Sequence, residues 1–189
     1  MILGLVGTPG AGKSHLAAAL VCLIGPTAIR VPMDGFHLAD VELARLGLLD
    51  KKGAPETFDP SGYASLLERL RSRSRQPLLA PGFDRDAEQP IADSITVGPD
   101  IDVVVSEGNY LLLDRPEWRR ARAQFDEVWY VATDEELRRE RLVARHIEFG
   151  KSPAAATEWV RRVDEPNARL VEDSRDGADK VIDLTGWES

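Results

Sequence analysis

The fold of this chain is decided by eight residues near its start, Gly7-Thr8-Pro9-Gly10-Ala11-Gly12-Lys13-Ser14, which match the pattern G-x-x-x-x-G-K-[ST]. A short apolar run, residues 1–6, precedes them, and a segment with helical periodicity follows. A strand, a glycine-rich turn and a helix in this order are the setting that a phosphate-binding loop requires. The sequence therefore predicts that residues 7–14 bind the phosphates of a nucleoside triphosphate.

The chemistry of this loop follows from its residue types. Glycine adopts positive φ and lets backbone N–H groups come close to phosphate oxygens at the start of the helix. We expect Lys13 to reach the β- and γ-phosphates, and the Ser14 hydroxyl to ligate Mg²⁺. The alternative, a chance match in a glycine-bearing turn, is disfavoured by the strand and helix around it. The residues predicted to bind the nucleotide are Gly7, Thr8, Gly10, Ala11, Gly12, Lys13, Ser14 and His15.

The composition indicates one globular domain, residues 1–189. Hydrophobic residues make up 43% and charged residues 30% of the chain, which are values typical of soluble proteins. The net charge of −8 argues against a nucleic acid or an acidic membrane as a partner. No stretch approaches the length of about 18 apolar residues that a membrane span needs, and no cationic leader is seen, so a cytoplasmic protein is predicted.

Strands and helices are predicted to alternate along the chain. The predicted strands are residues 2–6, 27–31, 101–106, 128–132 and 180–184, with shorter strands near 78–80 and 94–97. The predicted helices are residues 13–24, 39–46, 115–123, 134–148, 153–163 and 166–175, with a further helix beginning at 60. Such alternation is typical of a parallel, doubly wound sheet. We expect an α/β fold, the three-layer sandwich of P-loop NTPases with a parallel central sheet and a helical lid at about 141–155.

Local signals refine these expectations. Helix caps are predicted at Asp59, at Asp114 with Glu117, and at Thr133 with Glu136. The buried face of the first helix is predicted to carry Leu16, Leu20, Leu23 and Ile24. The single cysteine is expected to be a small core residue, Cys22. The tryptophans expected to pack the core are Trp118, Trp129, Trp159 and Trp187. No metal-ligand spacing involves His15 or His146.

Two acidic residues follow predicted strands at the edge of the sheet where ligands bind in such folds. Asp34 comes just after the second strand, where a carboxylate would face the γ-phosphate and accept a proton from a substrate hydroxyl. The alternative is a turn aspartate before Gly35. Glu107 ends a buried strand, which is the usual position of the acidic partner of the loop serine at the metal. Its alternative is a strand-end carboxylate that caps the turn at residues 108–109.

A run of arginines lies in the predicted helix 134–148, at Arg138, Arg139, Arg141 and Arg145, with Lys151 after it. Arginines on a mobile helix-loop-helix segment can neutralise the charge that develops on a transferred phosphoryl group. The alternative is a solvated helix face with i,i+4 pairs such as Glu135 with Arg139. We expect most of the run to be solvated and two arginines to be functional.

Taken together, these segments resemble the superfamily of uridine kinase, phosphoribulokinase and pantothenate kinase. The resemblance rests on the loop 7–14, the DGFH segment 34–37, the EGNY strand end 107–110 and the Arg/Lys lid. Segments 55–59, 81–85 and 178–182 also resemble family motifs, so the likeness runs from Ile2 to about Leu184. The chain is most similar to a bacterial subgroup of nucleoside/nucleotide kinase-like or fructose-transport-associated kinases.

The resemblance implies an ATP- and Mg²⁺-dependent kinase that phosphorylates a hydroxyl of a small molecule, in a protein that is a homodimer by family analogy. It implies Asp34 as general base, Glu107 on the metal side and Arg141 or Arg145 as the lid arginine. The residues implied on the acceptor side are Asp34, Phe36, His37, Phe83, Asp84 and Arg85, with residues 164–167 near the adenine. The chain departs from the family at His37, where uridine kinases commonly have tyrosine, and at Phe83-Asp84, which replaces a Tyr-Asp pair.

The sequence does not decide which molecule accepts the phosphoryl group. A nucleoside would need an aromatic ring for its base, which Phe36, Phe58 or Phe83 supplies, whereas a sugar would need polar groups such as His37, Asp84 and Arg85. A pantothenate-type alcohol is a further alternative. Another class of function is a nucleotide-dependent switch, but such proteins usually carry an Asn-Lys-x-Asp segment, which this chain lacks. A further class is a non-catalytic protein on a kinase scaffold. Such a protein need not keep Lys13, Ser14, Asp34 and Glu107, all of which are present here.

Overall fold

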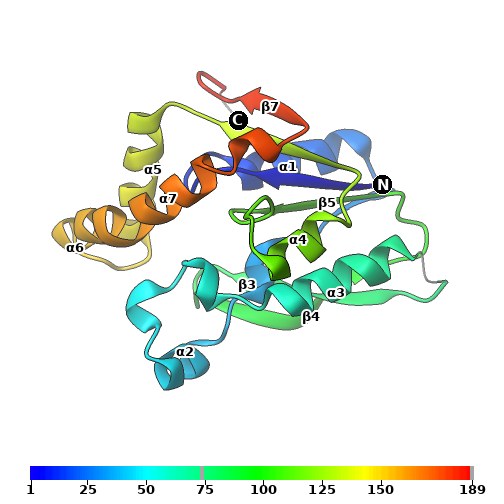
Figure 1. Cartoon of the computed structure of the whole chain (residues 1–189), viewed down its shortest axis with the longest axis horizontal. Coiled ribbons are helices and arrows are strands. Elements are labelled where there is room, and N and C mark those ends of the chain that lie inside the picture. Colours follow the sequence, from blue (N-terminus) through cyan, green and yellow to red (C-terminus); the bar gives the residue numbers. More distant parts are fainter. Residues whose placement is uncertain (73–74, 188–189) are drawn as a thin grey trace.

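A parallel sheet forms the centre of the protein (Figure 1). The computed structural model describes residues 1–72 and 75–187. In this part of the chain the sheet has five strands in the order β2-β5-β1-β6-β7, and every neighbouring pair is parallel. The strands are β1 (Ile2–Val6), β2 (Ala28–Arg30), β5 (Val103–Gly108), β6 (Glu127–Ala132) and β7 (Lys180–Asp183). The predicted parallel α/β sheet is confirmed.

Helices cover both faces of this sheet. Helix α1 covers one face, and α3 and α4 cover the other. The helices in the described residues are α1 (Lys13–Ile24), α2 (Asp40–Leu46), α3 (Pro60–Arg71), α4 (Pro116–Arg122), α5 (Glu135–Glu148), α6 (Pro153–Trp159) and α7 (Glu165–Glu172). Successive side chains of β1 point to opposite faces, so Ile2 and Val6 join the core beneath α3 and α4, whereas Leu3 and Leu5 pack against α1. These two cores make the predicted three-layer sandwich.

An antiparallel hairpin stands apart from the central sheet. It consists of β3 (Leu78–Asp84) and β4 (Gln89–Val97), with a register shift between Ala80 and Gly82. The sequence predicted only short strands here, because the Pro, Gly and Asp content of residues 77–100 reads as loop. The hairpin packs on η1, a 3₁₀ turn at Met33–Phe36. A Cβ on Gly35 would lie 2.4 Å from the carbonyl oxygen of Pro81, so only glycine permits this contact.

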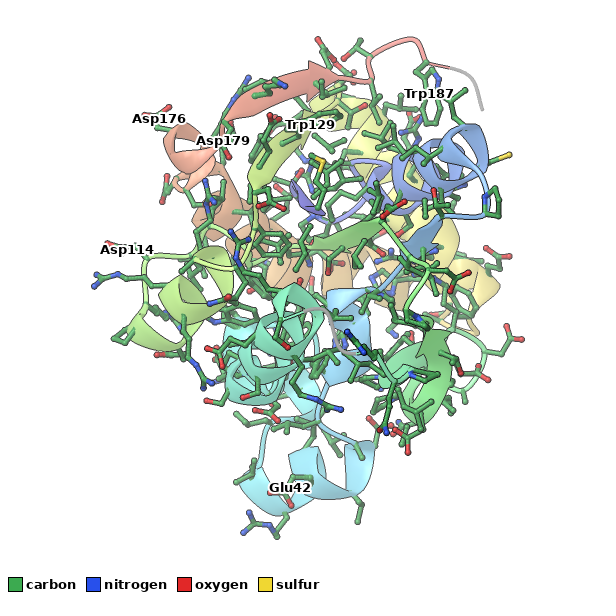
Figure 2. All side chains as sticks on the ribbon, turned by 90° about the vertical axis from the view of Figure 1, so that its right-hand side faces the viewer. Glu42, Asp114, Trp129, Asp176, Asp179 and Trp187 are labelled. Carbon is green, nitrogen blue, oxygen red and sulfur yellow. The ribbon has the colours of Figure 1, made fainter. Side chains whose placement is uncertain are left out.

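Several local expectations are corrected by the structure. Leu23, Ile24 and Cys22 are exposed rather than buried. At about 100° per residue, Cys22 lies on the face of α1 opposite the sheet, and Ile24 is in the last turn. Helix α1 therefore contacts the sheet through Ala17 and its helical neighbours. Only Trp118 is fully buried among the tryptophans. Trp187 lies beside α1 (Figure 2) and is, like Trp129 and Trp159, partly buried.

Helix caps were predicted correctly at one position and wrongly at two. The Asp59 carboxylate accepts the Gly62 N–H and starts α3, as predicted. Asp134, not Thr133, caps α5 by accepting the Leu137 N–H, because the helix begins one residue later than the capping box required. Asp114 pairs with Arg119 instead of capping α4. In the residues described, no helix is both long and apolar enough to cross a membrane.

Candidate active site

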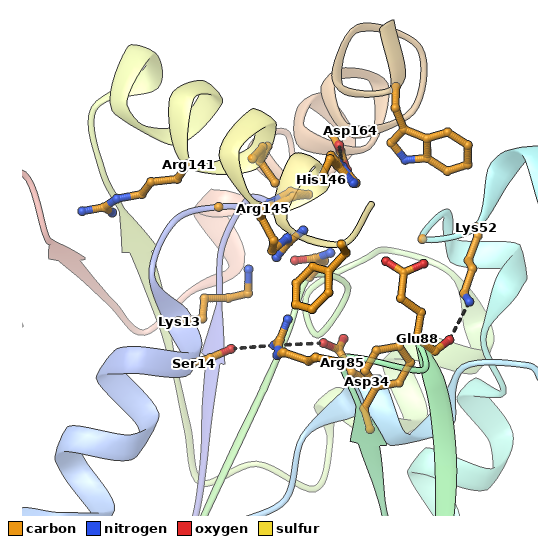
Figure 3. A pocket seen from close by; sticks show the side chains of 18 of the residues that line it. Lys13, Ser14, Asp34, Lys52, Arg85, Glu88, Arg141, Arg145, His146 and Asp164 are labelled. Carbon is orange, nitrogen blue, oxygen red and sulfur yellow. Dashed lines mark hydrogen bonds and ion pairs between the residues drawn. The ribbon is translucent and has the colours of Figure 1, made fainter. Parts of the chain in front are cut away.

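A cleft of about 870 Å³ opens where β1, β2 and β5 end. The loop after β1, the turn η1, the β3–β4 hairpin and helix α5 all contribute side chains to it (Figure 3). The residues from the sequence prediction that line it are Gly10, Gly12, Lys13, Ser14, His15, Asp34, His37, Phe83, Arg85, Glu107, Arg141 and Arg145. Gly7, Thr8 and Ala11 lie within the same loop, behind this lining.

The loop 7–14 has a backbone that requires glycine at several positions. Gly10 and Gly12 have φ of 83° and 92°, in the left-handed region that side chains disfavour. A Cβ on Gly7 would lie 2.5 Å from the Val131 carbonyl oxygen, so the loop packs directly on β6. Helix α1 begins right after Gly12, and its free N-terminal amides therefore face the cleft.

Lys13 is nearly buried beneath the loop. Its ammonium group donates to the carbonyl oxygens of Gly7, at 2.8 Å, and Thr8, at 2.9 Å. Removal from water lowers the pKa of Lys13 to about 8, although the carboxylates of Glu107 and Asp34 oppose this shift. The side chain is thus held where an anionic ligand in the loop would raise this pKa again.

Ser14, Glu107 and Arg30 form a polar group at the base of the cleft. Glu107 is 2% exposed, and its Oε1 accepts hydrogen bonds from Ser14 Oγ at 3.1 Å and from Arg30 Nη2 at 2.8 Å. A hydroxyl beside one carboxylate fits Mg²⁺, which takes one or two protein oxygens and completes its shell with phosphates and water. In the part of the chain described, no cluster of three His, Cys, Asp or Glu side chains offers a metal site independent of phosphates.

Asp34 faces the loop across the cleft. It lies on η1, which is fixed on both sides: Gly35 contacts the hairpin, and Met33 fills the space next to Gly108. Arg85 reaches from the hairpin between the two halves of the site, with Nη2 3.7 Å from Asp34 Oδ2 and 3.4 Å from Ser14 Oγ (Figure 3).

The predicted acceptor-side residues lie in different places. The His37 ring contacts the rings of Phe58 and Phe83 at tilted angles, with centroid distances of 3.9 and 4.9 Å, and all three line the cleft. Phe36 instead packs against Tyr63 in the core, with ring centroids 5.1 Å apart. Asp84 accepts the N–H groups of residues 86 and 87 and closes the hairpin turn.

The arginine run on α5 divides into two pairs. Arg141 and Arg145 line the cleft. Arg138 is 3% exposed and donates to the Glu165 carboxylate, at 2.5 Å, and to the Pro9 carbonyl. Arg139 pairs with Glu135 and Glu165 on the outer face. Helical geometry thus puts Arg138, Arg141 and Arg145 on the side of α5 that faces the loop 7–14, and Arg139 on the other side.

Comparisons with known proteins agree with this geometry. The chain is 38% identical over 145 residues to the ATP-dependent kinase-like protein notR' of Aspergillus versicolor, which covers 72% of this chain and 84% of that protein. It is 35% identical over 173 residues to a candidate uridine kinase of Schizosaccharomyces pombe, covering 87% and 73% of the two chains. A solved structure, described as a candidate fructose transport system kinase from Silicibacter sp. TM1040, superposes with a TM-score of 0.87 at 38% identity, over 96% of this chain and 89% of that one. No family model matches the chain.

This chain belongs to the uridine kinase-like family of P-loop ATP-dependent kinases. The resemblance drawn from the loop, the DGFH segment and the EGNY strand end is therefore confirmed, and so are the kinase activity and the use of ATP. Relatives that are kinases of this kind also imply a small-molecule phosphate acceptor.

The cleft also contains residues that were not among the site residues predicted from their own sequence signals. Lys52, Glu88, Phe149 and Trp159 line it. The Nε2 atom of His146, on α5, forms a 2.8 Å hydrogen bond with Oδ2 of Asp164. Asp164 is the last residue of the π-helical turn η4 (Val160–Asp164), which lies between α6 and α7. A π turn frequently marks a functional position, but it has no sequence signature that the helical period reveals. The segment 164–167 that family likeness placed near adenine thus contributes only Asp164 to the lining.

Proposed function

We propose that this kinase transfers the γ-phosphoryl group of MgATP to a hydroxyl of a small molecule, a nucleoside such as uridine or a sugar such as fructose, with Asp34 as the general base. One observation carries the proposal. Asp34 is the carboxylate that faces the loop 7–14 across the cleft, and Arg85 bridges it to Ser14. The acceptor hydroxyl would lie between Asp34 and the γ-phosphate. A pantothenate-type alcohol is the alternative acceptor.

The residues then divide the work. Asp34 takes the proton as the acceptor oxygen bonds to phosphorus and the bond to the β-phosphate oxygen breaks, releasing ADP. Lys13 and the loop amides hold the phosphates. Ser14 and Glu107 would hold Mg²⁺, which neutralises phosphate charge. Arg145, whose charge acts on the buried Lys13, approaches the transferred group.

We assign the lid to about residues 141–155, where the end of α5 leads through Gly150 to α6. Its inner side carries Arg145 and Phe149 into the cleft. Arg141 instead lies toward Gly12 of the loop 7–14. Trp187 also lines the cleft. An adenine ring fits between a guanidinium and an indole, so we place the base there rather than beside Asp164.

The test is ADP release from MgATP in the presence of uridine, cytidine, fructose, ribulose 5-phosphate or pantothenate. Acceptor-dependent release with one of them is expected, together with a loss of about 10²- to 10⁴-fold in kcat for Asp34→Asn. ATP binding should be nearly unchanged in that variant. Near-normal kcat in Asp34→Asn would rule out the base assignment. ADP release that no acceptor stimulates would favour a switch instead.

A further inference from the structure

Around Glu88 the cleft offers hydrogen-bond acceptors, and the neighbouring lysine, Lys52, is already paired with Asp40. We propose that the acceptor is a neutral, hydroxyl-rich molecule and that the Glu88 carboxylate selects it against anionic analogues. This inference rests on the proposed kinase function and adds a specificity-determining residue to it. The residues that carry it are Asp34, His37, Asp40, Lys52 and Glu88.

Glu88 enters the cleft from the end of the hairpin turn (Figure 3). Its φ of 50° is uncommon for a residue with a side chain. Its carbonyl oxygen accepts the Lys52 ammonium at 2.5 Å, which fixes the backbone. Its carboxylate makes neither an ion pair nor a hydrogen bond with any residue that the structure describes. A charged group is thereby held at the cleft wall with its oxygens available to a ligand.

His37 adds another acceptor. Its Nδ1 lies 2.9 Å from the Asp34 carbonyl oxygen, and a carbonyl only accepts, so Nδ1 carries the hydrogen. Burial lowers the pKa of His37, which keeps the ring neutral. Nε2 of a neutral ring with hydrogen on Nδ1 is an acceptor. Contacts with the rings of Phe58 and Phe83 hold the His37 ring in place.

The lysine beside Glu88 is already matched by a carboxylate, whereas Lys151, on the lid side, lies over the Trp159 ring. Lys52 is 14% exposed and lies 2.7 Å from Asp40 Oδ1. Burial alone would raise the pKa of Asp40, but hydrogen bonds with Lys52 and Gln89 lower it below its ordinary value. Asp40 therefore stays ionised beside Lys52. Arg85 points toward Ser14 and the phosphate side.

An acceptor molecule here meets the carboxylates of Asp34 and Glu88 and the Nε2 of His37. Hydroxyl groups donate to all three. A carboxylate or phosphate on the acceptor would instead be repelled by Glu88 and would find Lys52 already paired. Phe83 on the hairpin and Phe149 with Trp159 on the lid side offer apolar walls, which suit the C–H faces of a sugar or nucleoside.

The test compares acceptors that differ in charge and little else: glucitol with gluconate, uridine with orotidine, and pantothenol with pantothenate. ADP release is measured for the full chain with MgATP, and ATP binding is measured separately. We expect the neutral member of at least one pair to have the higher kcat/KM, by about tenfold or more. A response to the uridine pair would identify the acceptor as a nucleoside, and a response to the glucitol pair would identify it as a sugar.

Glu88→Gln should lower this neutral-to-anionic ratio about tenfold, because it removes the charge and keeps the shape. The matched control is Asp86→Asn on the same turn, outside the cleft lining, which should leave the ratio unchanged. Preference for an anionic member, or an unchanged ratio in Glu88→Gln, overturns the inference while the kinase function stands. If no member stimulates ADP release although MgATP binds, the kinase proposal fails and the inference fails with it.

Discussion

Ser14 Oγ lies 3.1 Å from Glu107 Oε1, although 93 positions separate the two residues. The parallel register explains this proximity, since Val6 pairs with Gly108 and Leu5 with Glu107. The loop that follows β1 therefore begins beside the end of β5. Arg30, at the end of β2 on the other side of β5, binds the same carboxylate oxygen at 2.8 Å. Three adjacent strands thus fix one buried carboxylate at the base of the phosphate site.

Replacement of Glu107 by glutamine should weaken the response to Mg²⁺. The amide oxygen still accepts from Ser14 and Arg30, so the fold should persist, but the charge that attracts a divalent cation is lost. We expect the Mg²⁺ concentration for half-maximal rate to rise about tenfold and kcat to fall about 10²-fold. A titration of Mg²⁺ at saturating ATP measures both. Glu127→Gln, which removes an exposed partner of Lys180, is the control. Equal Mg²⁺ dependence in the two variants would contradict a metal role for Glu107.

ATP binding should take up protons at alkaline pH. Because burial lowers the pKa of Lys13 to about 8, the free enzyme loses this proton as the pH rises through 8. Bound phosphates raise the pKa again, so ATP affinity should fall above pH 8, while below pH 7 Lys13 is charged in both states. Calorimetry in buffers of different ionisation enthalpy should show about half a proton taken up per ATP at pH 8.

The matched variant for this experiment is Lys13→Arg. A guanidinium remains charged at every pH of interest, so the proton uptake should vanish even if binding is weaker. Uptake that persists in Lys13→Arg would assign the proton to another group.

The sequence predicted the residues that gather around the loop 7–14, because their signals are local. The loop 7–14 is a continuous motif, and Asp34 and Glu107 each follow an apolar strand whose end points to the same edge of the sheet. Because parallel strands end at the same edge of the sheet, these residues come together without any long-range contact having to be predicted. The sequence did not predict a role for Arg30 in the site, because its partner, Glu107, lies far along the chain.

The half of the cleft that we propose binds the acceptor was harder to predict, because it depends on tertiary contacts. Lys52 and Glu88 come together only when the segment after α2 meets the hairpin, through one bond from Lys52 to a backbone carbonyl. The hairpin itself has the composition of a loop. Asp84 was assigned to the acceptor from family likeness, whereas in the structure its carboxylate closes the hairpin turn. A short polar side chain in a turn carries no mark that separates these two uses.

The two lid arginines should have separable effects. Arg145 is near the charge of Lys13, so Arg145→Ala should lower kcat, by about 10³-fold if it neutralises the transferred phosphoryl group, with little change in the KM for ATP. Arg141→Ala should mainly raise the KM for ATP, because Arg141 lies toward Gly12. Steady-state kinetics for ATP separates the two. Arg161→Ala, at an exposed pair with Glu158, should match the wild type. A loss of kcat in Arg141→Ala alone would exchange the two roles.

The contact between His146 and Asp164 should stabilise the lid side of the cleft. The two side chains are 9% and 12% exposed and lie 2.8 Å apart, and they join α5 to the π turn before α7. Asp164→Ala leaves His146 buried without its partner, which should lower the free energy of unfolding by about 1–3 kcal/mol. For a chain of this length, Tm should fall by about 2–4 °C per kcal/mol. Asp164→Asn keeps an oxygen that accepts from Nε2–H and should recover most of the loss. If Asn and Ala are equally destabilising, the charge of Asp164 rather than its hydrogen bond holds α5 to the π turn, and the Tm difference between the wild type and both variants should then shrink in high salt.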